Sequence, residues 1–225
     1  MFEFEEEFYT ILSRFNRSGA LKHLVLIGSW VLAVYRENYK IGNIQFTTRD
    51  IDFSVSRPHD PAKTSDPPIH LILTELGYMP YFSIIDKAEK YIPALDSIER
   101  SLNIEFLCDP GRYTKEPYRV KGLGIVTTPV TYQRVLLGNT ETLVYRGIPD
   151  IVPKPAYWAI HKIAISQLRK GENANLKMKK DLVGAHVVVN FLGEAQILSI
   201  SYQFKGKFLN LFHKGWHFYS SQFIY

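Results

Sequence analysis

The sequence predicts an α/β (α+β) fold, with a mixed β-sheet core and a small helical C-terminal part. Three observations support this prediction. Short alternating runs such as Asp50–Val55 are typical of half-buried strands. Helical patterns lie between such runs in residues 1–150, and two longer helical patterns follow Pro153. We therefore expect an α/β core over residues 1–150 and a basic, mainly helical part over residues 151–225.

The N-terminal elements follow from the spacing of apolar residues. The apolar side chains of the first segment recur at helical spacing and predict an amphipathic helix over residues 3–17: Phe4, Phe8, Ile11, Leu12 and Phe15. The apolar run 24–27 predicts a strand, and the stretch 29–37 predicts a helix. The alternating run 50–55 predicts the next strand.

The middle of the chain contains one helix signal and two strand signals. Residues 66–68, Asp-Pro-Pro, combine a capping residue with proline in a first turn, and Gly77 predicts the end of that helix. Residues 79–85 and 101–107 have the composition of strands. We therefore expect strands on both sides of residue 90.

The last third of the chain changes from β-rich to helical. Residues 119–148 favour strands, with a hairpin expected around residues 138–140, Gly-Asn-Thr. Pro153 and Pro155 predict the start of a helix that continues to about Lys170 and ends at Gly171. A second helix is expected over residues 176–192.

Composition narrows the class of protein. Of 225 residues, 46% are hydrophobic, which is enough for a sizeable core. The single cysteine, Cys108, excludes an intramolecular disulfide and favours a reducing compartment. The first residues are acidic where a signal peptide would be basic, and no apolar run approaches the ~20 residues needed to cross a bilayer. We expect a cytoplasmic protein without a membrane segment.

Charge is distributed unevenly along the chain. Residues 1–150 carry 17 Lys or Arg against 19 Asp or Glu, whereas residues 151–225 carry 10 against 3 and a net charge of +7. A basic C-terminal part beside an acidic site would attract a triphosphate or a nucleic acid. An excess of this size is also compatible with an ordinary solvated cationic face.

Two carboxylates on the predicted strand 50–55 point to a cation site. Asp50 and Asp52 project from the same face, roughly 6 to 7 Å apart at Cα, because side chains alternate along a strand. Like charges at this distance repel unless they are protonated or bridged by a cation. Mg²⁺ is commonly held by one or two carboxylates together with substrate phosphates. The pair therefore predicts part of a metal and phosphate site.

Two further features support this interpretation. Glu105 lies on the polar face of the predicted strand 101–107, and it would join the two aspartates if the strands were neighbours. Gly28 and Ser29 lie between a predicted strand and a predicted helix, where a small step in the backbone allows a phosphate to approach. The seven histidines lack zinc-ligand spacing, and no P-loop sequence is present.

This combination resembles the polymerase-beta-like nucleotidyltransferase superfamily, which has Gly-Ser or Gly-Gly at a strand–helix junction and an acidic-hydrophobic-acidic strand. The segment Phe46–Phe53 is most similar to the bacterial branch related to abortive-infection toxin nucleotidyltransferases. The stretch Val152–Lys162 and the run Lys179–Leu182 resemble the Pro-helix-Lys and Lys-Asp elements of that branch.

The resemblance implies an enzyme that needs Mg²⁺ or Mn²⁺ and transfers a nucleoside monophosphate from an NTP, such as ATP, to an acceptor hydroxyl. Asp50, Asp52 and Glu105 would be the catalytic metal ligands, and Glu105 would also serve as the base for the acceptor. The acceptor would be RNA, a protein or a small molecule. A toxin–antitoxin role with an antitoxin partner is also implied.

The candidate nucleotide contacts are Gly28, Ser29, Arg49, Lys162 and Lys180. The two lysines follow from the resemblance. Arg49 adjoins Asp50 but points to the opposite face of an ideal strand, where it would brace the site. Asp181 is expected to pair with a basic residue. A different class of function, a noncatalytic module that binds nucleotide or RNA on the same fold, stays open at this point.

Overall fold

A computed structural model describes residues 2–42, 48–83, 88–94, 102–110 and 116–223. Some sequence predictions reach beyond these ranges. Residues 46–47 of the resembling segment, residues 84–85 and 101 of two predicted strands, and residues 224–225 lie outside the described part.

The centre of the molecule is a mixed β-sheet. In chain order its strands are β1 (Val25–Ile27), β2 (Asp50–Val55), β3 (Tyr78–Ser83), β4 (Ala88–Pro93), β5 (Asn103–Cys108), β6 (Tyr118–Val120) and β7 (Ile125–Pro129). They pair in the order β1-β2-β5-β4-β3, while β7 pairs with both β5 and β6. The β2–β5 and β5–β7 pairs are parallel and the other pairs are antiparallel. A separate antiparallel hairpin consists of β8 (Thr140–Tyr145) and β9 (Ile148–Pro153).

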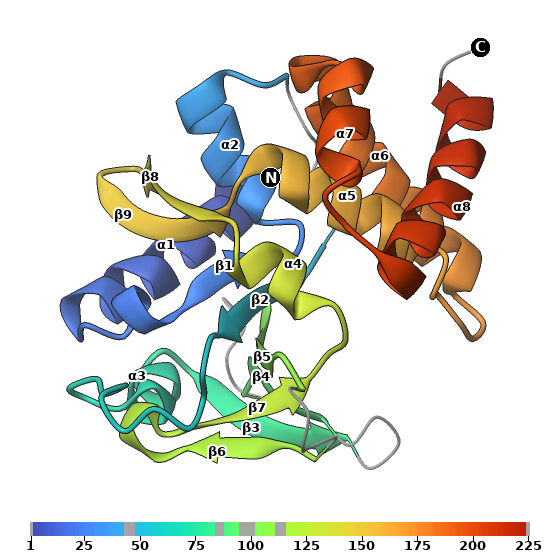
Figure 1. The fold of residues 1–225 in the computed structure, drawn as a ribbon. Helices are drawn as coiled ribbons and strands as arrows, with labels where there is room; N and C mark the ends of the chain where they lie inside the picture. The colour runs from blue at the N-terminus through green and yellow to red at the C-terminus, as the bar shows by residue number, and fades with distance from the viewer. Residues whose placement is uncertain (1, 43–47, 84–87, 95–101, 111–115, 224–225) are drawn as a thin grey trace.

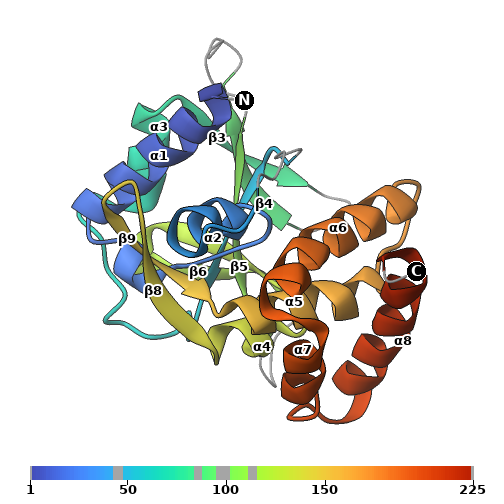
Figure 2. The same ribbon diagram turned by 90° about the horizontal axis from the view of Figure 1, so that it is seen from above.

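Helices pack around the sheet, and the C-terminal helices form a group on one side of it. The α-helices are α1 (Phe2–Arg17), α2 (Val31–Tyr39), α3 (Ile69–Glu75), α4 (Gln133–Leu137), α5 (Pro155–Ser166), α6 (Ala174–Leu192), α7 (Glu194–Ser201) and α8 (Gly206–Phe223), with short 3-10 turns η1 (Leu21–His23) and η2 (Lys121–Leu123). Helices α5 to α8 gather at the upper right of Figure 1, whereas α1 and α3 lie on the other side. Figure 2 shows the same separation from above.

Aromatic side chains connect the helices to the central strands. Phe15 of α1 packs against Phe53 of β2, with ring centroids 5.5 Å apart, and Phe53 stacks on Phe106 of β5 at 6.0 Å. Phe8 stacks on Trp30 at 4.5 Å, and all five rings are buried. The inward residues of β2 therefore fix one face of this strand in the core, so its aspartates project from the other face.

The observed fold confirms the predicted class, a mixed α/β sheet with a helical C-terminal part. The predicted hairpin around residues 138–140 is wrong. Gly138 and Asn139 follow the short helix α4, and the Asn139 side chain donates to the carbonyl of Val135 at 3.1 Å. The hairpin turn lies at Arg146 and Gly147, which have positive φ values of 46° and 82°, as a two-residue type I′ turn requires.

Two helix boundaries differ from expectation, and one helix was not predicted. Helix α3 begins after Pro68, which is extended at ψ 147°, so residues 66–68 precede the helix. Helix α5 ends at Ser166 rather than near residue 170. The aromatic C-terminal segment, for which no element was predicted, forms α8 and buries Phe208, Phe212 and Tyr219 at helical spacing.

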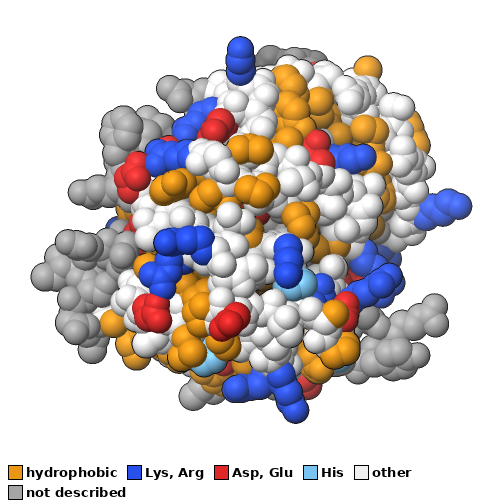
Figure 3. Space-filling model, turned by 90° about the vertical axis from the view of Figure 1, so that its left-hand side faces the viewer, with side chains coloured by type: hydrophobic (Ala, Val, Ile, Leu, Met, Phe, Trp, Pro, Cys, Tyr) orange, Lys and Arg blue, Asp and Glu red, His pale blue; other side chains and the backbone are white. Residues whose placement is uncertain are grey.

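The left-hand face of Figure 1 has a mixed surface. Figure 3 shows basic, acidic and hydrophobic side chains interspersed there. Among the described residues no single helix is long and apolar enough to cross a membrane. Helices α6 and α7 reach the required length and apolarity together, but the chain bends by 106° between them.

Candidate active site

The acidic side of the site is built on the parallel pair β2–β5. In this register Asp52 lies opposite Glu105, and Asp50 lies opposite Asn103. The two strands are neighbours, which is the condition under which Glu105 joins the two aspartates. Asn103 donates a hydrogen bond from Nδ2 to Oδ1 of Asp50 at 3.0 Å, which orients that carboxylate.

Gly28 lets the end of β1 approach the Asp52 side chain closely. Its φ is +68°, and a Cβ at this position would lie 2.0 Å from Oδ2 of Asp52. Only glycine combines this backbone conformation with that contact. The Gly28 carbonyl accepts a hydrogen bond from Nε1 of Trp158 in α5 at 2.8 Å, which ties the C-terminal helices to the glycine turn.

Basic side chains of α5, α6 and the connection between them form the opposite side. Lys162 donates from Nζ to Oδ1 of Asp181 at 2.9 Å, and Nε of Arg169 donates to Oδ2 of the same carboxylate at 2.6 Å. Asp181 is buried, and burial by itself would raise its pKa. The charges and hydrogen bonds of Lys162 and Arg169 outweigh that effect, and the pKa of Asp181 is lowered. The expected pairing of Asp181 with a basic residue is confirmed.

The two sides face one another across a polar cleft of about 230 Å³. Its lining residues come from both parts of the chain: Ser29, Thr48, Asp50, Asp52, Glu105, Lys162, Arg169, Lys177, Lys180 and Asp181. Two of the candidate nucleotide contacts do not line it. Gly28 contacts Asp52 from behind, and Arg49 is exposed outside the lining.

Three lining residues were missed by the sequence analysis. Thr48 accepts the backbone N–H of Asp50 at 3.3 Å and thereby supports the start of β2. Lys177 precedes Lys180 by three residues on α6, so the two share a helical face, and this spacing was the available signal for Lys177. Arg169 lies after the end of α5 at Ser166, so helical spacing does not place it in the cleft.

The cleft perturbs the acidity of its own groups. The pKa of Asp52 rises from 3.8 to about 7, first because of burial and then because of the Glu105 charge, while Lys162 partly offsets the rise. The pKa of Lys180 is lowered by burial and by the neighbouring Lys162 charge. The charged forms of Asp52 and Lys180 are therefore both destabilised in the cleft. A bound group of opposite charge would stabilise each of them.

The donor set suits a hard cation. Carboxylate oxygens are the ligands that Mg²⁺ and Mn²⁺ prefer, and a bound cation would favour the ionised form of Asp52, which burial and the Glu105 charge disfavour. Within the described ranges, no three His, Cys, Asp or Glu side chains are placed to hold a metal ion together. This arrangement is compatible with a cation that takes part of its ligands from substrate phosphates.

Comparison with known proteins identifies the family. The family model described as Nucleotidyltransferase matches residues 6–204, which include the whole cleft. The chain belongs to this nucleotidyltransferase family. No curated protein matches the sequence significantly.

Two solved structures are similar to the nucleotidyltransferase at low identity. One is the crystal structure of ANT(2")-Ia in complex with adenylyl-2"-tobramycin, with 12% identity, a TM-score of 0.49 and coverage of 94% of this chain and 97% of that chain. The other is the solution structure of the antibiotic-resistance factor ANT(2'')-Ia, with 13% identity, a TM-score of 0.48 and coverage of 93% and 95%.

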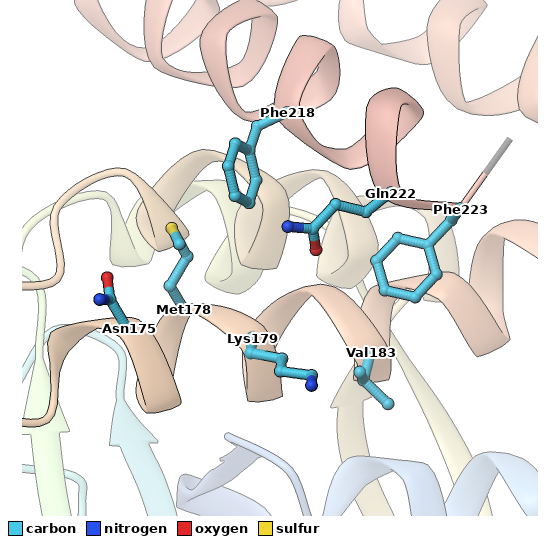
Figure 4. A pocket seen from close by; sticks show the side chains of 7 residues that line it. All are labelled: Asn175, Met178, Lys179, Val183, Phe218, Gln222 and Phe223. Atoms are coloured by element: carbon cyan, nitrogen blue, oxygen red, sulfur yellow. The ribbon is translucent and has the colours of Figure 1, made fainter. Parts of the chain in front are cut away.

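A second hollow of about 510 Å³ lies behind α6, as seen from the cleft. Its α6 residues include Met178 and Val183, which helical spacing places away from Lys177 and Asp181. In Figure 4, Phe218 of α8 and Met178 of α6 point toward one another across this hollow. It is mostly apolar and shares no residue with the cleft.

Proposed function

We propose that the nucleotidyltransferase transfers a nucleoside monophosphate from an NTP to an acceptor hydroxyl in this cleft. One observation carries the proposal. Asp50, Asp52 and Glu105 face a group of four basic side chains, Lys162, Arg169, Lys177 and Lys180, across about 230 Å³. Phosphoryl transfer from a triphosphate needs both signs of charge in one place, because the phosphates are anionic and the attacking hydroxyl must lose a proton.

On the acidic side, Asp50, Asp52 and Glu105 are the residues that would hold Mg²⁺ or Mn²⁺, together with oxygen atoms of the substrate phosphates. When bound, such a cation neutralises charge on the transferring phosphoryl group and the leaving oxygen. Glu105 would accept the proton of the acceptor hydroxyl. Asn103 keeps Asp50 oriented through its hydrogen bond, and Gly28 leaves room for Asp52.

On the basic side, Lys162 and Lys180 would bind the triphosphate, with Arg169 and Lys177 beside them. Asp181 holds Lys162 and Arg169 through two charge-assisted hydrogen bonds, so it positions these cations without neutralising the whole group. Ser29 lies where the backbone turns into α2 and would contact a phosphate. This division of charge would orient an NTP with its α-phosphorus toward the carboxylates.

The resemblance of the sequence to the abortive-infection branch extends the proposal to the substrates and the biological role of the protein. ATP is included among the candidate NTPs, and the acceptor hydroxyl belongs to RNA, a protein or a small molecule. The similarity of the segment Phe46–Phe53 to the abortive-infection branch supports a toxin–antitoxin component that acts in the cytoplasm and has an antitoxin partner.

The test is transfer of label from each α-labelled NTP, with Mg²⁺ and a cell lysate as the source of acceptor. We expect label in one acceptor class, and a rate lowered by roughly 10³-fold or more in Asp52→Asn. Glu75→Gln, at an exposed position on α3 outside the cleft, is the matched control and should retain the rate. Equal rates for Asp52→Asn and the native protein would exclude this mechanism. Binding of nucleotide or RNA without label transfer would favour the noncatalytic alternative.

A further inference from the structure

A third hollow, which we call the aromatic groove, lies away from the cleft. It has a volume of about 360 Å³, and its walls include Tyr39, Glu141, Lys154, Tyr157, Phe191 and Gln196. It shares no residue with the cleft. Phe191 follows Lys180 by eleven residues on α6, which corresponds to about 16 Å along the helix. The groove is therefore too distant to hold the reacting groups of the transfer.

Aromatic rings supply much of the groove surface. Tyr39 and Phe191 pack together with centroids 5.6 Å apart and an interplanar angle of 32°, yet Phe191 stays 45% exposed. The Tyr157 ring packs edge-on against Phe204 at 6.0 Å, and its hydroxyl donates to Gln203 at 3.1 Å. The rings are thus held in place by contacts on one side and present their other surfaces to the groove.

Glu141 brings one negative charge into these aromatic surroundings. Oε1 of Glu141 is covered and has no hydrogen-bond partner among the described residues, and no described Lys, Arg or His nitrogen lies within 4.0 Å of its carboxylate. Burial, and after it the neighbouring Glu141 carboxylate, raises the pKa of the Tyr39 hydroxyl well above its ordinary value. Because no described basic side chain pairs with this half-buried carboxylate, it favours a cationic ligand.

The dipoles of the helices that end at the groove determine where in it a positive charge is favoured. The C-terminal ends of α2 and α6, at Tyr39 and Phe191, border the Glu141 side and favour positive charge. The N-terminal end of α5, with exposed Lys154 before it, also borders the groove and disfavours positive charge close to it. A cation would therefore bind between Tyr39, Glu141 and Phe191.

We propose that the aromatic groove binds an organic ammonium ion with a flat apolar body. The ammonium group would bind the Glu141 carboxylate, and the body would lie against the rings of Tyr39, Tyr157 and Phe191, which attract cations and apolar groups alike. Lys154 is the competing cation of the groove. The site is separate from the nucleotide cleft and does not depend on transfer activity.

Calorimetric titration of the full chain with 2-phenylethylamine, without nucleotide, tests this site. The matched neutral probe is 2-phenylethanol, which has the same ring and chain length. We expect the amine to bind at least about tenfold more tightly than the alcohol, and Glu141→Gln to remove that preference. Phe191→Ala should weaken both probes, because it removes a stacking surface without changing charge.

Two control variants separate the aromatic groove from other acidic sites. Lys154→Met should leave amine affinity unchanged or increase it, because a competing cation is lost. Asp52→Asn should leave amine affinity unchanged, since that carboxylate belongs to the cleft. The proposal is overturned by absence of amine binding, by equal affinity for amine and alcohol, or by equal amine affinity in Glu141→Gln with a native melting temperature. Loss of binding in Asp52→Asn would also overturn it, because the amine would then bind in the cleft.

Discussion

Asp52 shows at the scale of one residue how the fold prepares charge for a ligand. Its carboxyl group lies opposite Glu105 and beside Gly28, and burial and the Glu105 charge raise its pKa to about 7. At neutral pH without a cation, the group is therefore close to half protonated. A bound cation would favour the ionised form.

This acidity predicts a pH dependence that varies with metal concentration. At limiting Mg²⁺, the transfer rate should rise with pH through about 7, because only the ionised Asp52 carboxylate binds the cation. At saturating Mg²⁺ the midpoint should move to lower pH. Rates measured from pH 5.5 to 8.5 at two Mg²⁺ concentrations, on the order of 0.1 and 10 mM, check this coupling. A midpoint that does not move with Mg²⁺ would contradict it.

Gly28 predicts a second residue-scale effect. Gly28→Ala would place Cβ 2.0 Å from Oδ2 of Asp52 at a φ of +68°, so the carboxylate or the turn must shift. We expect most transfer activity to be lost, together with roughly 1–3 kcal/mol of stability. Gly193→Ala is the matched control, because Gly193 also has positive φ, +86°, but nothing lies within 4 Å of its added Cβ. That variant should share the backbone strain and keep its activity, and equal rates in the two variants would contradict the argument.

Asp50 and Asp52 were accessible to prediction because their relative position is local, whereas the position of Glu105 also depends on which strand pairs with β2. Alternation along a strand places Asp50 and Asp52 on one face, and the parallel register then brings Glu105 beside them. Arg169, Lys177 and Thr48 were missed because the packing of α5 and α6 against the sheet decides which basic side chains reach the cleft. The roles of all these residues in transfer stay predictions.

At the scale of elements, β9 contains an unusual polar residue. Asp150 is fully buried, neither carboxylate oxygen has a hydrogen bond of ordinary geometry within the described residues, and burial raises its pKa from 3.8 to about 8. The backbone N–H of Ile151 offsets this only in part. The hairpin therefore carries a carboxylic acid that stays protonated at neutral pH.

The buried acid makes folding stability depend on pH. Between pH 3.8 and about 8 the unfolded chain releases the proton while the folded chain keeps it, so raising pH favours unfolding throughout this window. Asp150→Asn removes this dependence. We expect the stability of the variant relative to the native protein to increase by roughly 2 kcal/mol or more from pH 5 to pH 8.

Chemical denaturation of both proteins at several pH values measures this difference, and the Asp52 contribution cancels because both retain it. Glu172→Gln, at an exposed position, should show a difference that does not change with pH. A pH-independent difference for Asp150→Asn would show that Asp150 is ionised in the folded protein.

The elements themselves were predicted where local pattern decides them. The strands β2 and β5 and the helices α1 and α6 follow from alternation or helical spacing. The hairpin was misplaced because Gly138 and Asn139 favour a turn as strongly as Arg146 and Gly147 do, and only pairing with β9 decides between them. Helix α8 was missed because its aromatic residues cover more than one face.

At the scale of the whole molecule, the cleft joins two parts of the chain that differ in charge. The carboxylates come from the sheet, and the basic residues come from α5, α6 and the connection between them. The division into an α/β part before residue 150 and a helical part after it stays a prediction. A ligand that bridges the cleft would hold the two parts together.

Because a bound nucleotide would bridge the two parts, we expect it to raise the melting temperature of the protein. A Mg–NTP ligand at about 100 times its Kd should stabilise the folded protein by about 2.7 kcal/mol and raise the melting temperature by several degrees. Asp52→Asn should lose the part of the shift that requires Mg²⁺ and retain the part due to the basic side chains. Differential scanning calorimetry with NTP alone and with Mg–NTP separates the two parts. Equal Mg²⁺-dependent shifts in both proteins would contradict a metal role for Asp52.

The hydrogen bond between Trp158 and the Gly28 carbonyl makes one indole an intrinsic optical reporter. The ring lies between the turn that touches Asp52 and the Lys162 ammonium, whose nitrogen is 5.6 Å from the ring centroid. Nucleotide binding beside Lys162 would change the charge next to this ring, so the Trp158 share of the fluorescence of the three tryptophans would report nucleotide arrival without an attached dye.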